Sequence, residues 1–185
     1  MDIAEIESYL KDGAKLRNNI DYKKVYELGT ELSRRFRSGN KLILCGNGGS
    51  AADSQHIAAE FVGKFRKERR ALPALALNTN TSSLTAIGND YDFSKVFERQ
   101  IEAFAKSGDM VIGLSTSGNS PNIINALNKA NSMGCYTVAL TGRGGGKLKG
   151  IAKLTIEVNS SETSLIQEVH IAIGHIISKI VEDGL

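Results

Sequence analysis

Five short apolar segments alternate along this chain with segments of helical periodicity, and that alternation leaves few folds open. The apolar segments cover residues 41–45, 74–77, 110–115, 136–140 and 154–158, and the helical ones cover about 50–64, 94–105, 121–133 and 163–181. Continuously apolar strands joined by helical crossovers are typical of a parallel sheet that is covered on both faces. The sequence therefore predicts an α/β fold with a doubly wound, five-stranded parallel sheet.

The first 38 residues add two helices in front of this sheet. Apolar residues recur there at three- and four-residue spacing, and residues 18–21 separate the two stretches, with Asp21 suited to an N-cap. The chain has only two prolines and no linker, so we expect a single domain over residues 1–185, with residues 1–38 a helical N-terminal extension. Two helices exceed what one sheet needs. We therefore expect their spare apolar faces, and part of the apolar last helix, to pack against another subunit.

Composition narrows the classes of ligand and compartment. The chain is 41% hydrophobic and 23% charged, with a net charge of +3, which suits an anionic small molecule better than nucleic acid. The basic segment 64–70 is interpreted as a solvated loop. Cys45 and Cys135 each adjoin a predicted strand and are expected to be core residues in a reducing cytosol. With no signal peptide or long apolar run evident, we expect a cytoplasmic protein that binds no membrane.

A glycine-rich loop follows the first predicted strand. Its residues, Gly46-Asn47-Gly48-Gly49-Ser50, open a helix, where backbone N–H groups and the positive end of the helix dipole favour an anion. The loop matches neither a dinucleotide fingerprint nor a Walker A motif. A tight strand-to-helix turn with Ser50 as N-cap explains it equally well, so both interpretations stay open.

A second loop, after the third predicted strand, is rich in hydroxyl groups. Ser115, Thr116, Ser117 and Ser120 surround a glycine, and Pro121 is well placed as the first helical residue. A helix cap needs only one of these four hydroxyls, so the surplus favours a phosphate cradle. Because both loops lie at carboxyl ends of strands, they are expected to face one crevice of the sheet.

Two helices carry the residues suited to proton or metal chemistry. His56 and Glu60 lie four residues apart and share one helix face. On the last helix, Gln167 and His175 lie near one stripe but about 12 Å apart along the axis, and Gln167 and His170 form a competing pair. A capping box formed by Ser164 and Gln167 would also explain that glutamine. Spacing alone leaves these alternatives open.

Two further polar segments are less specific. Residues 81–90 are predicted to form a polar loop, in which Asn89 and Asp90 either bind sugar hydroxyls or close a turn. The glycines at 144–146 are interpreted as a flexible turn rather than a site.

From about residue 20 to the end, the chain resembles the phosphoheptose isomerases of the sugar isomerase (SIS) family. The resemblance rests on Cys45-Gly46-Asn47-Gly48-Gly49-Ser50-Ala51-Ala52-Asp53, Gln55-His56-Ile57-Ala58-Ala59-Glu60, Thr85-Ala86-Ile87-Gly88-Asn89-Asp90, Ser115-Thr116-Ser117-Gly118-Asn119-Ser120 and Ile166-Gln167-Glu168-Val169-His170. It implies a flavodoxin-like fold, a homotetramer with active sites between subunits, and one Zn²⁺ per subunit.

The resemblance also implies roles for individual residues. The metal ligands would be His56, Glu60, Gln167 and His175, so the family pattern selects His175 where spacing left His170 open. Within that site Glu60 is expected to act as the base and His175 as the acid. Substrate contacts would come from Asn47, Gly48, Gly49, Ser50, Glu60, Asn89, Asp90, Ser115, Thr116, Ser117, Ser120 and Gln167.

The implied reaction is an aldose–ketose isomerisation through an enediol. It converts sedoheptulose 7-phosphate to D-glycero-D-manno-heptose 7-phosphate, the first step toward ADP- or GDP-heptose precursors of lipopolysaccharide and related glycans. Family members commonly carry an Arg at Lys64, and Asp or Ala followed by Arg at Ser164 and Leu165; these departures concern the sugar rather than the reaction class. The alternatives are a non-catalytic phosphosugar-binding regulator or partner-binding protein, and an isomerase for another ketose phosphate.

Overall fold

The computed structural model describes residues 1–185 and confirms the predicted doubly wound sheet. Its strands are β1 (Leu42–Gly46), β2 (Ala74–Ala76), β3 (Met110–Ser115), β4 (Tyr136–Thr141) and β5 (Leu154–Glu157). All pairings are parallel, in the order β2-β1-β3-β4-β5. The strand order reverses between β1 and β3, which is where ligands bind in open α/β sheets.

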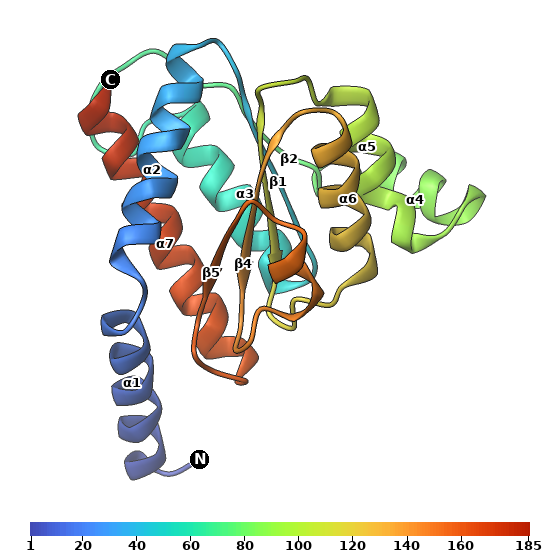
Figure 1. The fold of residues 1–185 in the computed structure, drawn as a ribbon. Coiled ribbons are helices and arrows are strands. Elements are labelled where there is room, and N and C mark those ends of the chain that lie inside the picture. The colour runs from blue at the N-terminus through green and yellow to red at the C-terminus, as the bar shows by residue number, and fades with distance from the viewer.

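Helices cover both faces of the sheet (Figure 1). They are α1 (Ile3–Asn18), α2 (Tyr22–Arg37), α3 (Gly49–Val62), α4 (Thr81–Asp90), α5 (Val96–Phe104), α6 (Pro121–Ser132) and α7 (Thr163–Gly184), with short 3₁₀ turns η1 (Phe93–Lys95) and η2 (Gly146–Gly150). Leu42 and Leu44 of β1 join the core under α2, α3 and α7, whereas Ile43 and Cys45 join the core under α5 and α6. This alternation explains the continuously apolar strand, since both of its faces are buried.

The two N-terminal helices have different roles within the chain. Asp21 caps α2 as predicted, because its side chain accepts hydrogen bonds from the N–H groups of Lys23 and Lys24. The apolar stripe of α2 is buried, partly against α7, and so is not spare. In contrast, α1 projects from the body of the molecule (Figure 1) and leaves Ile3 and Leu10 exposed. Packing of residues 1–38 against another subunit stays a prediction, and α1 is the part with apolar surface to spare.

Helix α7 is long and apolar enough to span a membrane by length and composition alone. Half of its most apolar stretch is buried inside the chain, and the helix packs against α2 and α3. Both cysteines are buried, as predicted.

One local prediction was wrong, and two of the alternatives that had been left open are excluded. Residues 81–90 form helix α4 rather than a loop, because the Asn80 side chain caps it by accepting from the Ser83 N–H and because Leu84 packs against the core under α5 and α6. Helix α3 begins after Gly48 instead of being capped by Ser50. No Ser164–Gln167 capping box forms, since the N-cap of α7 is residue 162 and makes no side-chain cap bond.

Candidate active site between α3 and α7

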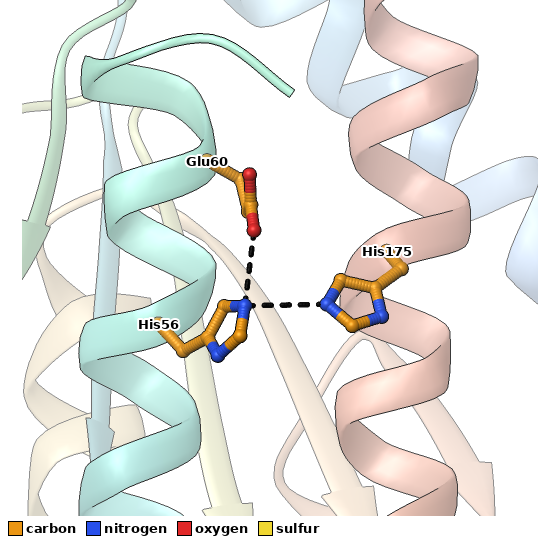
Figure 2. A group of neighbouring side chains, drawn as sticks. All are labelled: His56, Glu60 and His175. Atoms are coloured by element: carbon orange, nitrogen blue, oxygen red, sulfur yellow. Dashed lines mark hydrogen bonds and ion pairs between the residues drawn. The ribbon is translucent and has the colours of Figure 1, made fainter. Parts of the chain in front are cut away.

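Three polar side chains meet where α3 packs against α7. His56 and Glu60 lie one turn apart on α3 and face His175 on α7 (Figure 2). The Nε2 atom of His56 is 3.0 Å from Oε1 of Glu60 and 3.3 Å from Nε2 of His175. The structure thus brings together three of the four residues predicted as metal ligands, although 119 residues separate the two histidines.

A glycine permits the close approach of these two helices. Gly174 precedes His175, and a Cβ atom there would lie 2.5 Å from Cγ1 of Ile57, the neighbour of His56. The missing side chain therefore allows α3 and α7 to touch at the level of the two imidazoles. The His175 ring also stacks against Phe65, with ring centroids 5.8 Å apart and an interplanar angle of 20°.

Gln167 lies about two turns before His175 and reaches the start of α3. Its Nε2 atom is 3.5 Å from Oγ of Ser50, and a Cβ atom on Gly49 would lie 2.5 Å from its Oε1. Gln167 therefore lies against the glycine-rich loop. Its role as a fourth metal ligand stays a prediction.

His170 belongs to the core and not to this cluster. Its side chain is fully buried, and Nε2 lies 3.2 Å from the Thr141 carbonyl oxygen. Burial lowers the pKa of His170 to about 4, although the contact with Thr141 acts in the opposite direction. Of the two histidines that spacing could not separate, His175 is the one that faces His56.

The two loops predicted to bind an anion follow adjacent strands, β1 and β3, where the strand order reverses. Asn47 of the glycine-rich loop and Asn122, in the first turn of α6 after the second loop, exchange two hydrogen bonds, of 3.0 and 2.9 Å. Gly48 has φ +56°, a conformation that L side chains rarely adopt, so the turn requires glycine there. The Asn47–Asn122 pair therefore connects the glycine-rich loop to the start of α6.

The hydroxyl group at the N-cap position of α6 does not cap the helix. Ser120 occupies the N-cap position of α6, and Pro121 begins the helix as predicted, but the Ser120 side chain makes no cap bond. Its Oγ lies 2.9 Å from Oγ of Ser115, which in turn lies 3.4 Å from Oγ of Ser117. A cluster of neutral donors beside a helix N-terminus suits phosphate oxygens.

Asn89 and Asp90 lie apart from the other predicted site residues. They are exposed at the end of α4, where Nδ2 of Asn89 donates a 2.9 Å hydrogen bond to Asp90. Helix α4 packs against α5, on the opposite face of the sheet from α3 and α7 (Figure 1). A single chain does not bring these two residues to the histidines, and their contact with substrate stays a prediction.

Sequence reasoning assigned no role to Asp53, which lies one turn before His56. Burial raises its pKa to about 6, against an opposing effect of His56, and its Oδ2 atom is buried with no hydrogen-bond partner. The sequence feature that could have pointed to Asp53 was its position three residues before His56 on the same helix.

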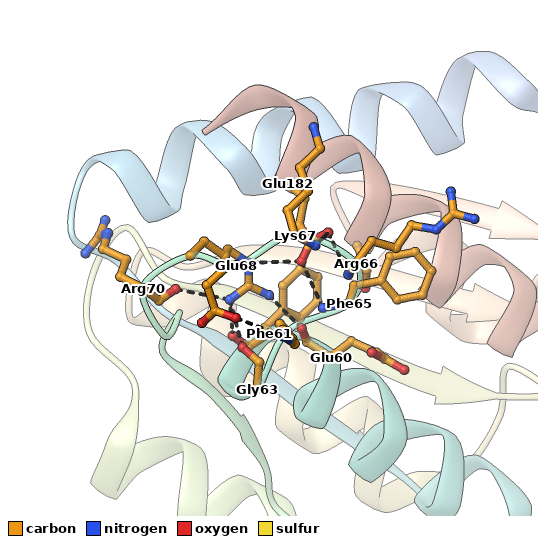
Figure 3. A network of polar contacts seen from close by, with 12 residues as sticks. Glu60, Phe61, Gly63, Phe65, Arg66, Lys67, Glu68, Arg70 and Glu182 are labelled. Atoms are coloured by element: carbon orange, nitrogen blue, oxygen red, sulfur yellow. Dashed lines mark hydrogen bonds and ion pairs between the residues drawn. The ribbon is translucent and has the colours of Figure 1, made fainter.

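The basic segment 64–70 is only partly the solvated loop that was predicted. Lys64 and Lys67 are exposed, but the Arg69 side chain is 10% exposed and pairs with the buried carboxylate of Glu182 (Figure 3). The number of basic residues in the segment could not reveal this difference, because nothing in the local sequence distinguishes Arg69 from its exposed neighbours. A carboxylate on the apolar face of α7 was the only hint.

Comparison with known proteins identifies the fold family. The model of the SIS domain family matches residues 8–142. The chain belongs to the SIS domain family. A probable phosphoheptose isomerase from Thermoplasma acidophilum is 51% identical over 97% of this chain and 98% of its own. The phosphoheptose isomerase from Aquifex aeolicus is 57% identical over 82% of this chain and 80% of its own.

A solved structure gives the same result. Phosphoheptose isomerase from Neisseria gonorrhoeae is 36% identical, has a TM-score of 0.91 and covers 97% of this chain and 98% of its own. These comparisons confirm the predicted fold, the resemblance to phosphoheptose isomerases and the prediction that the chain is an isomerase.

Proposed function

We propose that this protein converts sedoheptulose 7-phosphate to D-glycero-D-manno-heptose 7-phosphate, the first step toward a nucleotide-activated heptose for lipopolysaccharide or related glycans. The observation that carries the proposal is the convergence of His56, Glu60 and His175 on the same two helices that bring Gln167 against the glycine-rich loop. Groups able to move protons thus lie on the same two helices as a candidate anion site. The names of the relatives support the heptose phosphate as substrate.

We propose Zn²⁺ as the cofactor, held by His56, Glu60, Gln167 and His175. The first, second and fourth of these offer ligand atoms that all lie within 4.8 Å of one another. Ligands about 2.0–2.1 Å from a tetrahedral zinc lie about 3.3 Å apart, close to the 3.0 and 3.3 Å measured here. The two imidazoles and the carboxylate therefore fit the ion, and the side-chain amide of Gln167 is proposed as the fourth ligand. When bound, it would supply Lewis-acid polarisation of the sugar oxygens.

Glu60 would transfer the protons bound to carbon, and His175 those bound to oxygen. Glu60 removes a proton from C1 of the open-chain ketose as the C2 oxygen gains one, which gives a cis-enediol. The same carboxyl then returns a proton to C2 as the C1 oxygen loses its own, which leaves the aldose. His175 would serve the oxygens in both steps through Nδ1, because its Nε2 faces His56 and is the nitrogen proposed to hold the ion. The stack with Phe65 would hold the imidazole of His175 in place for this.

The phosphate would bind at the hydroxyl-rich loop. Ser115, Thr116, Ser117 and Ser120 offer donors without adding charge, and the adjacent start of α6 favours an anion. Binding energy from this remote group would align C1 and C2 with Glu60. Asn47, Gly48, Gly49, Ser50, Asn89 and Asp90 are proposed to contact the rest of the sugar.

We also propose a cytoplasmic homotetramer with active sites between subunits. The His56 side chain is 51% exposed in one chain, so the site is open to solvent on that side. A neighbouring subunit that covers it, and that supplies Asn89 and Asp90, would exclude water from the enediol. The apolar residues left exposed on α1 are suited to such packing.

The test is turnover of sedoheptulose 7-phosphate, followed by NMR, in wild type and in Glu60→Gln. We expect a loss of about 10²- to 10⁴-fold in kcat with substrate binding largely retained, because the amide cannot accept the proton. Glu68→Gln is the matched control, since that carboxylate is exposed and pairs only with Lys64. Near-normal turnover in Glu60→Gln would refute the assignment of the base.

Two further arms address the cofactor and the rival functions. Removal of metal with a chelator should lower turnover, and added Zn²⁺ should restore it. A panel of C5 to C7 ketose phosphates should give the highest kcat/KM for the heptose. No turnover of any member by metal-loaded protein that binds them would favour the phosphosugar-binding regulator instead.

A further inference from the structure

The segment that follows α3 is fastened to the end of α7 by a buried carboxylate. Glu182 accepts hydrogen bonds from the backbone N–H groups of Phe65, Arg66 and Lys67, at 2.8, 3.0 and 3.2 Å. Its side chain is 2% exposed, and its Oε1 atom lies 3.2 Å from Nε of Arg69 (Figure 3). This one carboxylate therefore contacts three consecutive backbone N–H groups and one guanidinium group within residues 65–69.

Arg69 extends this network to the end of α3. Its Nη2 donates to the Glu60 carbonyl oxygen at 2.7 Å, and its Nη1 donates to the carbonyl oxygens of Phe61 and Gly63 at 2.9 and 3.1 Å. These are carbonyl groups in the last turn of the helix and just beyond it, where a cation is favourable. The guanidinium therefore joins the backbone of Glu60 to the carboxylate on α7.

The same carboxylate also binds the backbone of Phe65, the residue whose ring stacks on His175. The Phe65 N–H makes the shortest of the three bonds to Glu182, and the Phe65 ring lies on the imidazole at 5.8 Å. Glu182 lies two turns beyond His175 on α7 and so acts on it from outside the ligand cluster. Each of the two helices that carry the cluster is thus tied to one rigid segment.

We propose that Glu182 and Arg69 are positioning residues for the metal site: through Phe65 and the Glu60 backbone, they hold His175 and Glu60 at ligand distance from His56. This inference rests on the proposed function, because it assumes that the cluster binds a divalent cation. Neither residue touches the ligand atoms. Their effect is to reduce the conformational freedom of two ligands before an ion arrives.

The chain offers a matched control for this carboxylate. Asp183 is the next residue, pairs with Lys67 of the same segment and with Lys179, and is exposed. Replacing it removes a negative charge from the same turn of α7 without touching Phe65 or Arg69. Glu182→Gln is close in shape, but its amide nitrogen would face N–H donors in place of an acceptor.

The experiment measures Zn²⁺ affinity by competition with a chromophoric chelator, and Co²⁺ absorption as a geometric readout, in the full chain. We expect Glu182→Gln and Phe65→Leu to weaken Zn²⁺ binding about 10- to 100-fold and to alter the Co²⁺ spectrum. Asp183→Asn should match wild type, and Phe65→Tyr, which keeps the stacked ring, should retain affinity. Should Glu182→Gln fail to fold, Arg69→Lys takes its place with the same expected loss of affinity, because it keeps the positive charge but removes the forked donors to the carbonyl oxygens of Glu60 and Phe61.

The outcomes separate this inference from the proposed function. Wild type that binds Zn²⁺, with affinity lost in His175→Ala, supports the metal site. Unchanged affinity and an unchanged Co²⁺ spectrum in Glu182→Gln and Phe65→Leu would then overturn the positioning role alone. Wild type that binds neither ion would overturn both.

Discussion

His170 and His175 lie five residues apart on α7, which places them about 140° apart around the helix axis. One imidazole is therefore held in the core against the Thr141 carbonyl, and the other faces α3. Desolvation disfavours the charged form of a buried imidazole, and the single contact with Thr141 does not compensate for it. His170 is thus kept neutral inside the fold.

We predict that His170 makes the protein sensitive to acid. Its pKa is about 4 in the folded chain and about 6.5 in an unfolded one, so the unfolded state binds the proton first as the pH falls. The stability it contributes is present above pH 6.5 and is lost between pH 6.5 and 4, to a total of about 3 kcal/mol. Urea denaturation of wild type and His170→Gln across this range should show a shallower decline in the variant. Parallel pH curves would contradict this assignment.

At the scale of elements, the site depends on how closely α3 and α7 pack. Gly174 lies at a close contact between the two helices, and a Cβ atom there would be 2.5 Å from Ile57 Cγ1, so no other residue type fits without movement. Helix propensity alone would favour alanine at this position by about 1 kcal/mol. Overpacking a dense contact costs about 1–3 kcal/mol, so the contact with Ile57 should dominate.

Gly174→Ala is therefore predicted to lower stability and to weaken Zn²⁺ binding, because the added methyl group separates the two histidines. Gly88→Ala is the control. That glycine also lies inside a helix, but its Cβ atom would meet only Val96 Cγ1, at 3.9 Å. This variant should be more stable than wild type by up to about 1 kcal/mol, as judged by chemical denaturation. Wild-type Zn²⁺ affinity in Gly174→Ala would show that the helix spacing is not critical.

The elements themselves were largely predictable, because hydrophobic periodicity reports burial directly. The strand over Met110–Ser115 was predicted at its observed bounds, and the others lie within about a residue of theirs. Helix α4 was missed because its first turn, Thr81-Ser82-Ser83, reads as a turn sequence, while the cap that starts it comes from the preceding Asn80. Propensity depends on local sequence, whereas the formation of helix α4 depended on a side-chain cap and on packing against the core.

The site was predictable to a lesser degree. Spacing alone placed His56 and Glu60 on one face of a helix, as observed, but the choice between His170 and His175 required the family resemblance. The contacts that Glu182 makes with residues 65–69 could not be predicted, because they join residues more than 110 positions apart through irregular backbone. No periodic pattern reports such contacts.

At the scale of the whole molecule, α1 is the part that a single chain leaves least covered. It touches α7 through polar contacts, in which the Tyr9 hydroxyl donates to Glu168 and Arg17 pairs with the same carboxylate. Its apolar residues Ile3 and Leu10 are 85% and 63% exposed. An amphipathic helix with its apolar side in water is unfavourable, so we expect that side to be covered in the assembly.

The double variant Ile6→Glu/Leu10→Glu is predicted to dissociate the proposed homotetramer, because charges placed on the apolar side of α1 cannot be buried between subunits. Sedimentation velocity should show a smaller species with an unchanged circular dichroism spectrum. Lys11→Glu, a charge change at an exposed position one residue along, should leave the assembly intact. An unchanged sedimentation coefficient in the double variant would place the interface elsewhere.

The candidate ligands His56 and His175 lie on either side of four of the five strands in sequence. A ligand bound by both would link the two ends of the segment that contains β2 to β5, so its binding free energy would oppose every opening that separates α3 from α7. Amide hydrogens deep in β3 and β4 should then exchange more slowly with solvent deuterium once the ligand is bound, although they never contact it.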